Sequence, residues 1–473
     1  EAAYVLQARI FAAGRWADPP PPRAEFFEQA HVLVEPRRAA KYPPGHSLAL
    51  APGAAADLPA AVPVLLAGMT GALLYARTRR LAGPIAGILT WTVWVASPLG
   101  LRYRSSFFSE VTTGLLFLLV WTGVSRWRER GRTAWLVLAG AAAGFGAITR
   151  PLTMLLLVIP FAIVVLRDAV RRRAWLAIGI AAFAGILPSL ILLPLWNART
   201  TGDARTSPVE LYTRQYLPFD VPGLGLRADA PTRALPEDLR RLSSTFASVH
   251  RLHVWERLPG ILRDRVTEWL RAGCGAGIVL LLPIAVAGLF VLPREGWLAV
   301  SAGALLLVGY LAYAHLAHWS VYYFEALVPL TLAAGVGLAA VLAGLPRRFG
   351  AFGLVLSLLG FAILIARGMT TERSIKRSQE APFRLLEERL ETLPEQPAIV
   401  FVRYAEGHNP ALSLIRNGPD ISRQLTWIVY DRGAENARLR AVEPSRAAYL
   451  YDEGTGVLAP LDPAPSSRPA PPL

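Results

Sequence analysis

Ten long apolar segments, separated by polar loops, constrain the fold of this chain more than any other feature of its sequence. A helix needs roughly 17–25 mostly apolar residues to cross a bilayer. The chain is 53% hydrophobic and has a mean hydropathy of +0.37, which is too apolar for a soluble protein of this length. The candidate spans cover residues 58–76, 82–99, 109–125, 134–149, 151–166, 174–196, 273–292, 297–314, 323–344 and 350–367. We therefore predict an all-α polytopic membrane protein with about ten transmembrane helices.

The loops between these segments alternate in charge. Arginines follow the first, third, fifth, seventh and ninth spans, at positions 77–80, 126–132, 167–173, 294 and 347–348. Short basic loops stay in the cytoplasm, which places outside the cytoplasm residues 1–57, 100–108, 197–272 and 368–473. Much of the net charge of +15 lies in the cytoplasmic loops, where it meets anionic lipid. Because the sequence also lacks the usual nucleic-acid-binding motifs, we exclude nucleic acid as a partner.

The basic residues of this chain are almost all arginine, since lysine occurs only as Lys41 and Lys376. This composition is typical of a bacterium with GC-rich DNA, and we expect a multi-pass protein of the bacterial inner (plasma) membrane with an extracytoplasmic C-terminus. The chain opens on Glu1 without an initiator methionine. We expect a preceding N-terminal piece that carries one more membrane span.

Three regions follow from this topology. Residues 1–57 form a first extracytoplasmic loop, and helical spacing of apolar residues over 1–18 predicts an amphipathic helix on the membrane surface. Residues 58–367 form the transmembrane domain, which includes the long outer loop 197–272. Residues 368–473 form an extracytoplasmic domain with a disordered last dozen residues. In this domain we predict a small α/β or α+β unit with a helix at 383–391 and strands at 398–404, 426–430 and 447–451.

The stretch from Lys41 to His46, Lys-Tyr-Pro-Pro-Gly-His, closes the first outer loop shortly before the first apolar span. A cation held by a rigid turn at the edge of a bilayer can bind a lipid-linked phosphate. We take Lys41 and Tyr42 as candidate substrate-binding residues. A proline-capped entry into a helix explains the same stretch equally well.

Two acidic residues are candidate catalytic groups. Glu110 lies at the outer end of the third span, where a carboxylate is costly unless it is paired or functional. Arg102 and Arg104 are candidate substrate-binding residues and its candidate partners. A negative residue at a helix N-terminus also has a purely structural explanation. Glu1 begins the predicted surface helix in the same compartment.

Arg150 lies in a Thr-Arg-Pro turn between two short spans, which we expect to form a kinked or re-entrant pair. Arginine makes bidentate contacts to phosphate, although a guanidinium at a helix end can also reach back to the interface. The stretch 315–325 contains two histidines, Tyr322 and Glu325. An aromatic belt at the membrane interface explains most of it better than a metal site does, and Tyr322 and Glu325 are candidate pocket residues.

Together these motifs resemble the GT-C superfamily of membrane glycosyltransferases. The branch that they resemble contains the protein O-mannosyltransferases and the lipid A aminoarabinose transferase. The resemblance runs over most of the chain, and it rests on the order of these stretches: Glu1–Tyr4 as the remnant of an acidic Asp-Glu opening, Phe11–Arg15, Lys41–Gly45, Ser109–Glu110, Thr149–Pro151 and His318–Tyr323.

The resemblance implies an inverting transfer of a sugar from a polyprenyl-phosphate donor to an acceptor outside the cytoplasm. It implies that Glu1 and Glu110 are the acidic pair and that Lys41 and Arg150 hold the phosphate. The base of such enzymes is usually the first residue of the Asp-Glu pair, and this chain opens at the second. The acceptor is a lipid, a glycan or a protein of the cell envelope, and membrane lipids surround the enzyme. No cofactor is expected, and the pattern does not support a divalent metal.

A transporter or flippase of lipid-linked saccharides is the alternative function. It predicts ionisable groups in mid-membrane and internal repeats, whereas the polar groups here collect at the outer edge. A non-catalytic membrane scaffold is a third possibility. Convergence of Lys41, Glu110 and Arg150 in space favours the enzyme, and scatter favours the scaffold.

Overall fold

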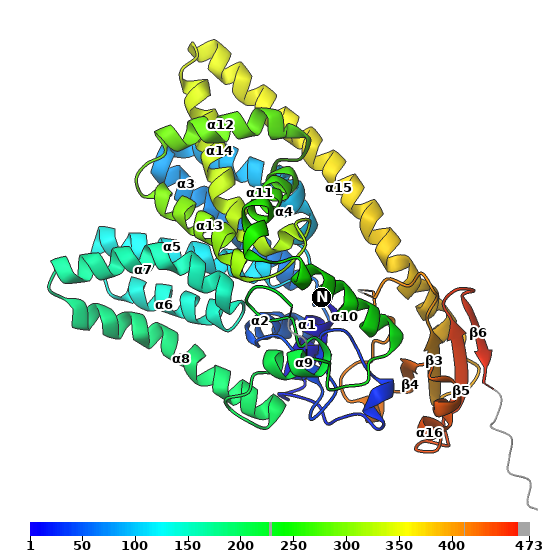
Figure 1. Cartoon of the computed structure of the whole chain (residues 1–473). Coiled ribbons are helices and arrows are strands. Elements are labelled where there is room, and N and C mark those ends of the chain that lie inside the picture. Colours follow the sequence, from blue (N-terminus) through cyan, green and yellow to red (C-terminus); the bar gives the residue numbers. More distant parts are fainter. Residues whose placement is uncertain (227–228, 411, 462–473) are drawn as a thin grey trace, which may run out of the picture.

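The computed structural model describes residues 1–226, 229–410 and 412–461, which form a helical bundle and a head region (Figure 1). The bundle contains α3 (Ala61–Ala96), α4 (Pro98–Tyr103), α5 (Glu110–Arg130), α6 (Ala134–Ala147), α7 (Pro151–Arg171), α8 (Trp175–Thr201), α11 (Leu258–Cys274), α12 (Ile278–Val291), α13 (Gly296–Gly309), α14 (Leu327–Ala343) and most of α15 (Arg347–Glu391). The head contains α1 (Ala2–Ala12), α2 (Gly45–Ala55), α9 (Pro208–Tyr216), α10 (Glu237–Arg251), α16 (Asn436–Arg440) and all the described strands.

Six helical stretches of the described chain are long and apolar enough to cross a membrane, which makes the chain an integral membrane protein. They are Ala61–Ala96, Pro151–Arg171, Trp175–Thr201, Trp255–Val291, Ser320–Ala343 and Arg347–Glu391. The predicted number of about ten spans is therefore not confirmed. One reason is that α6 and α13, each of 14 residues, are too short to count.

A second reason is that two predicted spans, 58–76 and 82–99, share the helix α3. This helix is interrupted at Gly83, whose φ of +90° is a conformation that favours glycine. A Cβ on Gly71 would lie 3.0 Å from the ring of Trp91, and one on Gly87 would lie 3.1 Å from the ring of Tyr75. The two halves of α3 therefore run antiparallel, side by side.

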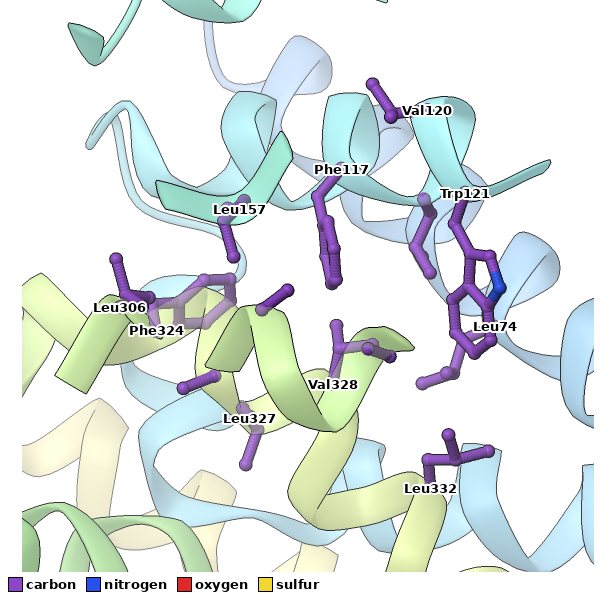
Figure 2. Close-up of a cluster of buried hydrophobic side chains, with 14 of the residues drawn as sticks. Leu74, Phe117, Val120, Trp121, Leu157, Leu306, Phe324, Leu327, Val328 and Leu332 are labelled. Atoms are coloured by element: carbon purple, nitrogen blue, oxygen red, sulfur yellow. The ribbon is translucent and has the colours of Figure 1, made fainter. Parts of the chain in front are cut away.

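The core of the bundle lies where α5, α7, α13 and α14 meet α3. Figure 2 shows Phe117 and Trp121 pointing from α5 toward α14 and α3. The same cluster includes Phe324, which directly precedes Glu325 and is buried. Burial of a large apolar side chain contributes roughly 1.5–3 kcal/mol, so this packing holds the start of α14 against α5.

Helices α6 and α8 approach each other through glycine. A Cβ on Gly185 of α8 would lie 2.6 Å from the backbone nitrogen of Ala141 and 2.9 Å from the carbonyl carbon of Gly140. Small residues permit such close backbone contact between membrane helices, where dispersion rather than the hydrophobic effect drives association.

We expect Gly185→Ala to lower the stability of the bundle by about 1–3 kcal/mol, because the new methyl group overpacks the α6–α8 contact. Gly179→Ala on the same helix is the matched control, since a Cβ there meets no described atom within 4 Å. Thermal unfolding of the purified protein in detergent measures both. Equal melting temperatures for the two variants would contradict the close approach.

In the head, α1 is packed inside the protein, which corrects the prediction of an amphipathic helix on the membrane surface. Its residues Tyr4, Leu6, Gln7 and Ala8 are buried, and the helix contacts α2 and the ribbon formed by β1 (Val32–Leu33) and β2 (Ala39–Ala40). The Gln7 side chain accepts a hydrogen bond from the backbone N–H of Ala40 at 3.0 Å. The polar side chain of Gln7 thus bonds to the head instead of facing solvent.

The C-terminal unit is a four-stranded sheet in the order β4-β3-β5-β6. Its strands are β3 (Ala398–Arg403), β4 (Thr426–Tyr430), β5 (Ala447–Asp452) and β6 (Val457–Pro460). The central strand β3 pairs in parallel with β4 and β5, and β6 is antiparallel to β5. The predicted α/β unit and its three strands are confirmed. The predicted disordered tail lies outside the described residues.

The sheet is covered on both faces. Val400 and Val402 pack with Leu386 near the end of α15, whereas Phe401 packs with Phe26 and Phe27 of the N-terminal segment. Figure 1 shows α15 as one long helix that runs from the far end of the bundle to the sheet. The predicted span at 350–367 and the predicted helix at 383–391 are therefore parts of a single helix.

Candidate functional site

Arg150 is the centre of a buried charge cluster. Its Nη1 forms an ion pair with Oε1 of Glu110 and lies 3.6 Å from Oε1 of Glu325. Its Nη2 donates a hydrogen bond of 3.1 Å to the hydroxyl of Tyr310. All four side chains are buried, Glu325 completely. Three charged residues from distant parts of the chain therefore share one site.

Local structure explains where these charges lie. Glu110 is the first residue of α5, and Arg150 is the N-cap of α7 with proline at the next position. Proline is favoured at the first helical position because its missing N–H is unbonded there in any case. The backbone N–H of Gly45 donates to the carbonyl of Ile148 at 2.8 Å, which ties the Lys41–His46 stretch to the α6–α7 turn. Both charges are thus held on backbone elements that are themselves anchored.

The charge cluster is incompletely hydrogen-bonded. Among the described residues, Oε2 of Glu110 and both carboxylate oxygens of Glu325 are buried without a hydrogen-bond partner. Two carboxylates face one guanidinium, so the cluster has an excess of acceptors. Buried polar atoms are normally bonded, and free acceptors beside a cation provide places for the hydroxyl groups of a ligand.

Lys41 forms a second cluster. Its Nζ lies 3.6 Å from Oδ2 of Asp220, and the rings of Tyr42 and Tyr212 lie 5.4 and 4.8 Å away. Asp220 also accepts a hydrogen bond from the hydroxyl of Tyr313. Burial lowers the pKa of Lys41, and the charge of Asp220 opposes this shift. The ammonium group is thus held between aromatic faces by one carboxylate.

Aromatic side chains join the two clusters. The ring of Tyr322 lies 6.0 Å from the guanidinium carbon of Arg150 and also 6.0 Å, between centroids, from the ring of Tyr313. On the side of the head, Tyr4 stacks on Tyr42 with 4.5 Å between ring centroids. Lys41, Glu110 and Arg150 therefore lie around one aromatic wall, as expected for a common site.

Glu1 lies at the edge of this site. Its carboxylate accepts a hydrogen bond of 2.8 Å from the backbone N–H of Phe107, close to the start of α5. Tyr4 donates a hydrogen bond of 3.1 Å from its hydroxyl to Ser109. The beginning of α1 is thus bonded to the segment that carries Glu110.

The predicted partners of Glu110 are wrong. Arg102 forms an ion pair with Glu372 of α15 at 3.0 Å, and Arg104 donates to the carbonyl of Val95 at 2.7 Å. Both arginines lie in or just after the short helix α4, which packs against α15 and directs them away from Glu110. Arg150 takes the place that was expected for them.

Sequence reasoning missed three residues of the site. Asp220, the partner of Lys41, lies in a long loop without a recognisable motif. Tyr310 was seen only as an apolar residue within a span. His46 is buried and joins α2 to α5, because its ring nitrogens bond Thr112 at 2.8 Å and the carbonyl of Phe107 at 3.0 Å. Only the position of His46 in the Lys41 stretch could have indicated it.

Of the histidine pair at 315 and 318, His315 has both ring nitrogens facing partners in the described part of the chain. Nε2 of His315 bonds the hydroxyl of Tyr323 at 2.8 Å, and its Nδ1 faces the carbonyl of Leu316 at 2.9 Å. Within the described ranges, no three His, Cys, Asp or Glu side chains are grouped as metal ligands.

We expect Asp220→Asn to lower the pKa of Lys41 further, because it removes the carboxylate that opposes burial. The chain has only two lysines, so a protein labelled with ¹³C at lysine Cε gives two NMR signals, and Lys376→Arg assigns them. The Lys41 signal should titrate below its ordinary 10.5 in the wild type and lower still in the variant. At a pH between the lowered pKa of Lys41 in the folded protein and its ordinary 10.5 in the unfolded chain, the unfolded chain binds a proton that the folded chain has lost. In that pH range Lys41 therefore makes the stability of the protein rise with pH. If the Lys41 signal titrates identically in Asp220→Asn and in the wild type, the charge of Asp220 does not act on Lys41.

Comparisons with known proteins give a family match for part of the chain and a fold match for most of it. Residues 48–196, which include Glu110 and Arg150, match the family of dolichyl-phosphate-mannose-protein mannosyltransferases. No curated protein matches the sequence.

The fold is similar to that of ArnT from Cupriavidus metallidurans in the apo state. The TM-score is 0.50 at 15% identity, and the match covers 95% of this chain and 87% of that chain. For ArnT bound to undecaprenyl phosphate, the TM-score is 0.47 at 16% identity, and the match covers 95% of this chain and 88% of that chain. For the apo oligosaccharyltransferase of Archaeoglobus fulgidus, the TM-score is 0.43 at 11% identity, and the match covers 88% of this chain and 60% of that chain. Residues 48–196 thus resemble that mannosyltransferase family, and the chain as a whole has the fold of the apo ArnT structure.

Proposed function

We propose that this protein transfers a sugar from a polyprenyl-phosphate donor to an acceptor on the extracytoplasmic side of a bacterial inner membrane, with inversion. The observation that carries the proposal is the convergence of two cations, Lys41 and Arg150, with the buried carboxylate of Glu110 around one aromatic wall. The matched family is named for a sugar on dolichyl phosphate, which is a polyprenyl carrier. A donor of that class suits a charged site in a membrane protein.

In the proposed complex, Lys41 and Arg150 hold the phosphate of the donor. A guanidinium has five N–H donors in a plane. The ion pair of Arg150 with Glu110 and its one hydrogen bond to Tyr310 leave donors for a phosphate oxygen. As the bond between the anomeric carbon and the phosphate oxygen breaks, negative charge grows on that oxygen. Preorganised cations stabilise such charge more in the transition state than in the ground state.

Glu110 is the proposed general base. One of its oxygens faces Arg150, and the other is free to accept the proton of an acceptor hydroxyl. The hydroxyl oxygen attacks the anomeric carbon from the side opposite the phosphate, and polyprenyl phosphate leaves. Proton transfer to such a base contributes about 10²–10⁴-fold to rate. Glu1 is its proposed acidic neighbour.

Tyr42 and Tyr322 are proposed to contact the sugar. Aromatic faces cover the apolar side of a sugar ring, while Glu325 supplies acceptors for its hydroxyl groups. These residues border both cations, so a sugar beside the bound phosphate would reach them. The type of sugar and the acceptor then depend on the shape of this wall.

The test is donor turnover in membranes that contain the full chain. Polyprenyl-phosphate-linked hexoses and pentoses with a radiolabelled lipid are supplied, and liberated polyprenyl phosphate is measured, which reports transfer to any acceptor. We expect at least one of these donors to liberate polyprenyl phosphate. Movement of intact lipid-linked saccharide across the membrane, without liberation of the lipid phosphate, would instead support a transporter.

A further inference from the structure

A polar cavity of about 630 Å³ lies in the head, apart from the Arg150 and Lys41 clusters. It is formed where β3 and β4 end, and the first turn of α10 forms its other side. Figure 1 shows α10 between the bundle and the sheet. The carboxyl ends of parallel strands are where open α/β sheets bind ligands, and the volume is within the range of small-molecule sites.

Two buried side chains that line this cavity carry polar atoms without a partner. Oδ2 of Asp238 accepts a hydrogen bond of 2.7 Å from the hydroxyl of Tyr430, whereas its Oδ1 has no partner among the described residues. The same is true of Nε2 of His408, whose Nδ1 bonds Glu453 at 2.9 Å. Asp238 and His408 are 5% and 9% exposed. Each is fixed by one hydrogen bond and keeps one unpartnered polar atom in the lining of the cavity.

The lining also contains an aromatic platform. The rings of Tyr404 and His408 are stacked with 3.8 Å between their centroids, and the ring of Tyr430 lies 5.7 Å from that of Tyr404. The Tyr404 hydroxyl bonds the backbone N–H of Leu414 at 2.9 Å, which holds its ring in place. Polar atoms beside rigid rings match a molecule with hydroxyl groups on an apolar frame.

The charges of the lining are nearly balanced, with four arginines against five carboxylates. Arg241 pairs with Glu237 at 2.6 Å and Arg403 pairs with Asp431 at 2.8 Å. An anion in the cavity would lie beside the buried carboxylate of Asp238, and burying the charge of the anion there would be costly. The cavity therefore favours an uncharged ligand that donates hydrogen bonds to Asp238.

We propose that this cavity is a saccharide-binding site, in which Oδ1 of Asp238 and Nε2 of His408 bond sugar hydroxyls beside the Tyr404 ring. The proposal does not depend on the transfer reaction. The helix α10 that carries Asp238 in its first turn carries His250 in its last, and Nε2 of His250 lies 4.0 Å from Oδ1 of Asp220. A saccharide in the cavity would thus contact the helix that borders the Lys41 cluster.

Calorimetric titration of the purified full chain tests the proposal. The probes are free mannose, glucose, galactose, arabinose, N-acetylglucosamine and their common disaccharides, with inorganic phosphate as the anionic comparison. We expect at least one sugar to bind and Asp238→Ala to weaken that binding at least tenfold. Glu395→Ala, at an exposed position of the same unit outside the cavity, should bind as the wild type does.

Hydrogen exchange of the wild-type protein provides a second measurement that needs no variant. The bound sugar should protect amides of residues 237–241 and 403–408. The proposal is overturned if no sugar binds at millimolar concentration, if phosphate alone binds, or if a bound sugar protects other segments and survives Asp238→Ala.

Discussion

Replacement of Arg150 by alanine is expected to abolish donor turnover and to destabilise the protein by about 3–5 kcal/mol, which is typical when a buried ion pair loses one partner. The variant leaves the carboxylates of Glu110 and Glu325 buried without their shared cation. It also removes the bond to Tyr310. Unfolding in mixed detergent and SDS measures the stability change, and liberation of polyprenyl phosphate measures turnover.

A triple variant separates the structural role of Arg150 from its role in transfer. When Arg150, Glu110 and Glu325 are all replaced by glutamine, no charge stays buried at this site, and most of the lost stability should return. Turnover should stay absent, because no cation remains at this position and no carboxylate accepts the proton. Full activity in this triple variant would show that the cluster only supports the fold.

Glu110→Gln is expected to reduce kcat by about 10²–10⁴-fold, since an amide keeps the shape of the carboxylate but cannot accept a proton. The KM for the donor should change little, because a loss confined to the transition state lowers kcat and kcat/KM together. The amide oxygen can still accept a bond from Arg150, and Glu325 still neutralises that arginine. Stability should therefore fall much less than in Arg150→Ala.

Glu129→Gln is the matched control for this experiment. Glu129 lies on the same helix α5, near its other end, where its half-exposed side chain pairs with Arg126 at 3.3 Å. Its replacement should leave kcat unchanged. If Glu110→Gln keeps full activity while Glu1→Gln loses it, the base is at the start of α1 and Glu110 only positions Arg150.

Much of the architecture followed from local properties of the sequence. Apolar stretches of membrane length and the strands at 398–404, 426–430 and 447–451 correspond to elements of the structure, because hydrophobic runs and β-branched segments are encoded within a few residues. The number of spans was harder to predict. Two short apolar stretches fold back on each other at Gly83 within α3, and α15 continues through polar sequence as far as the sheet.

The sequence also indicated individual candidate residues of the site. Lys41, Glu110 and Arg150 are charged groups at the ends of apolar segments, where a charge is costly unless it is paired or functional. The sequence did not indicate which partners these charged residues take. Arg102 and Arg104 are nearest to Glu110 in the sequence, yet they bond α15 and Val95. Asp220 lies in a loop far from Lys41, and no local pattern indicated the contact.

The sequence by itself thus determined the class of protein, the C-terminal sheet and the charged residues worth testing. These depend on hydrophobicity and charge, which are local. Tertiary structure alone decided which carboxylate meets which cation, and that α1 is buried in the head. A buried charge takes the partner that the packing of helices brings within a few ångströms, and that distance is unrelated to separation along the chain.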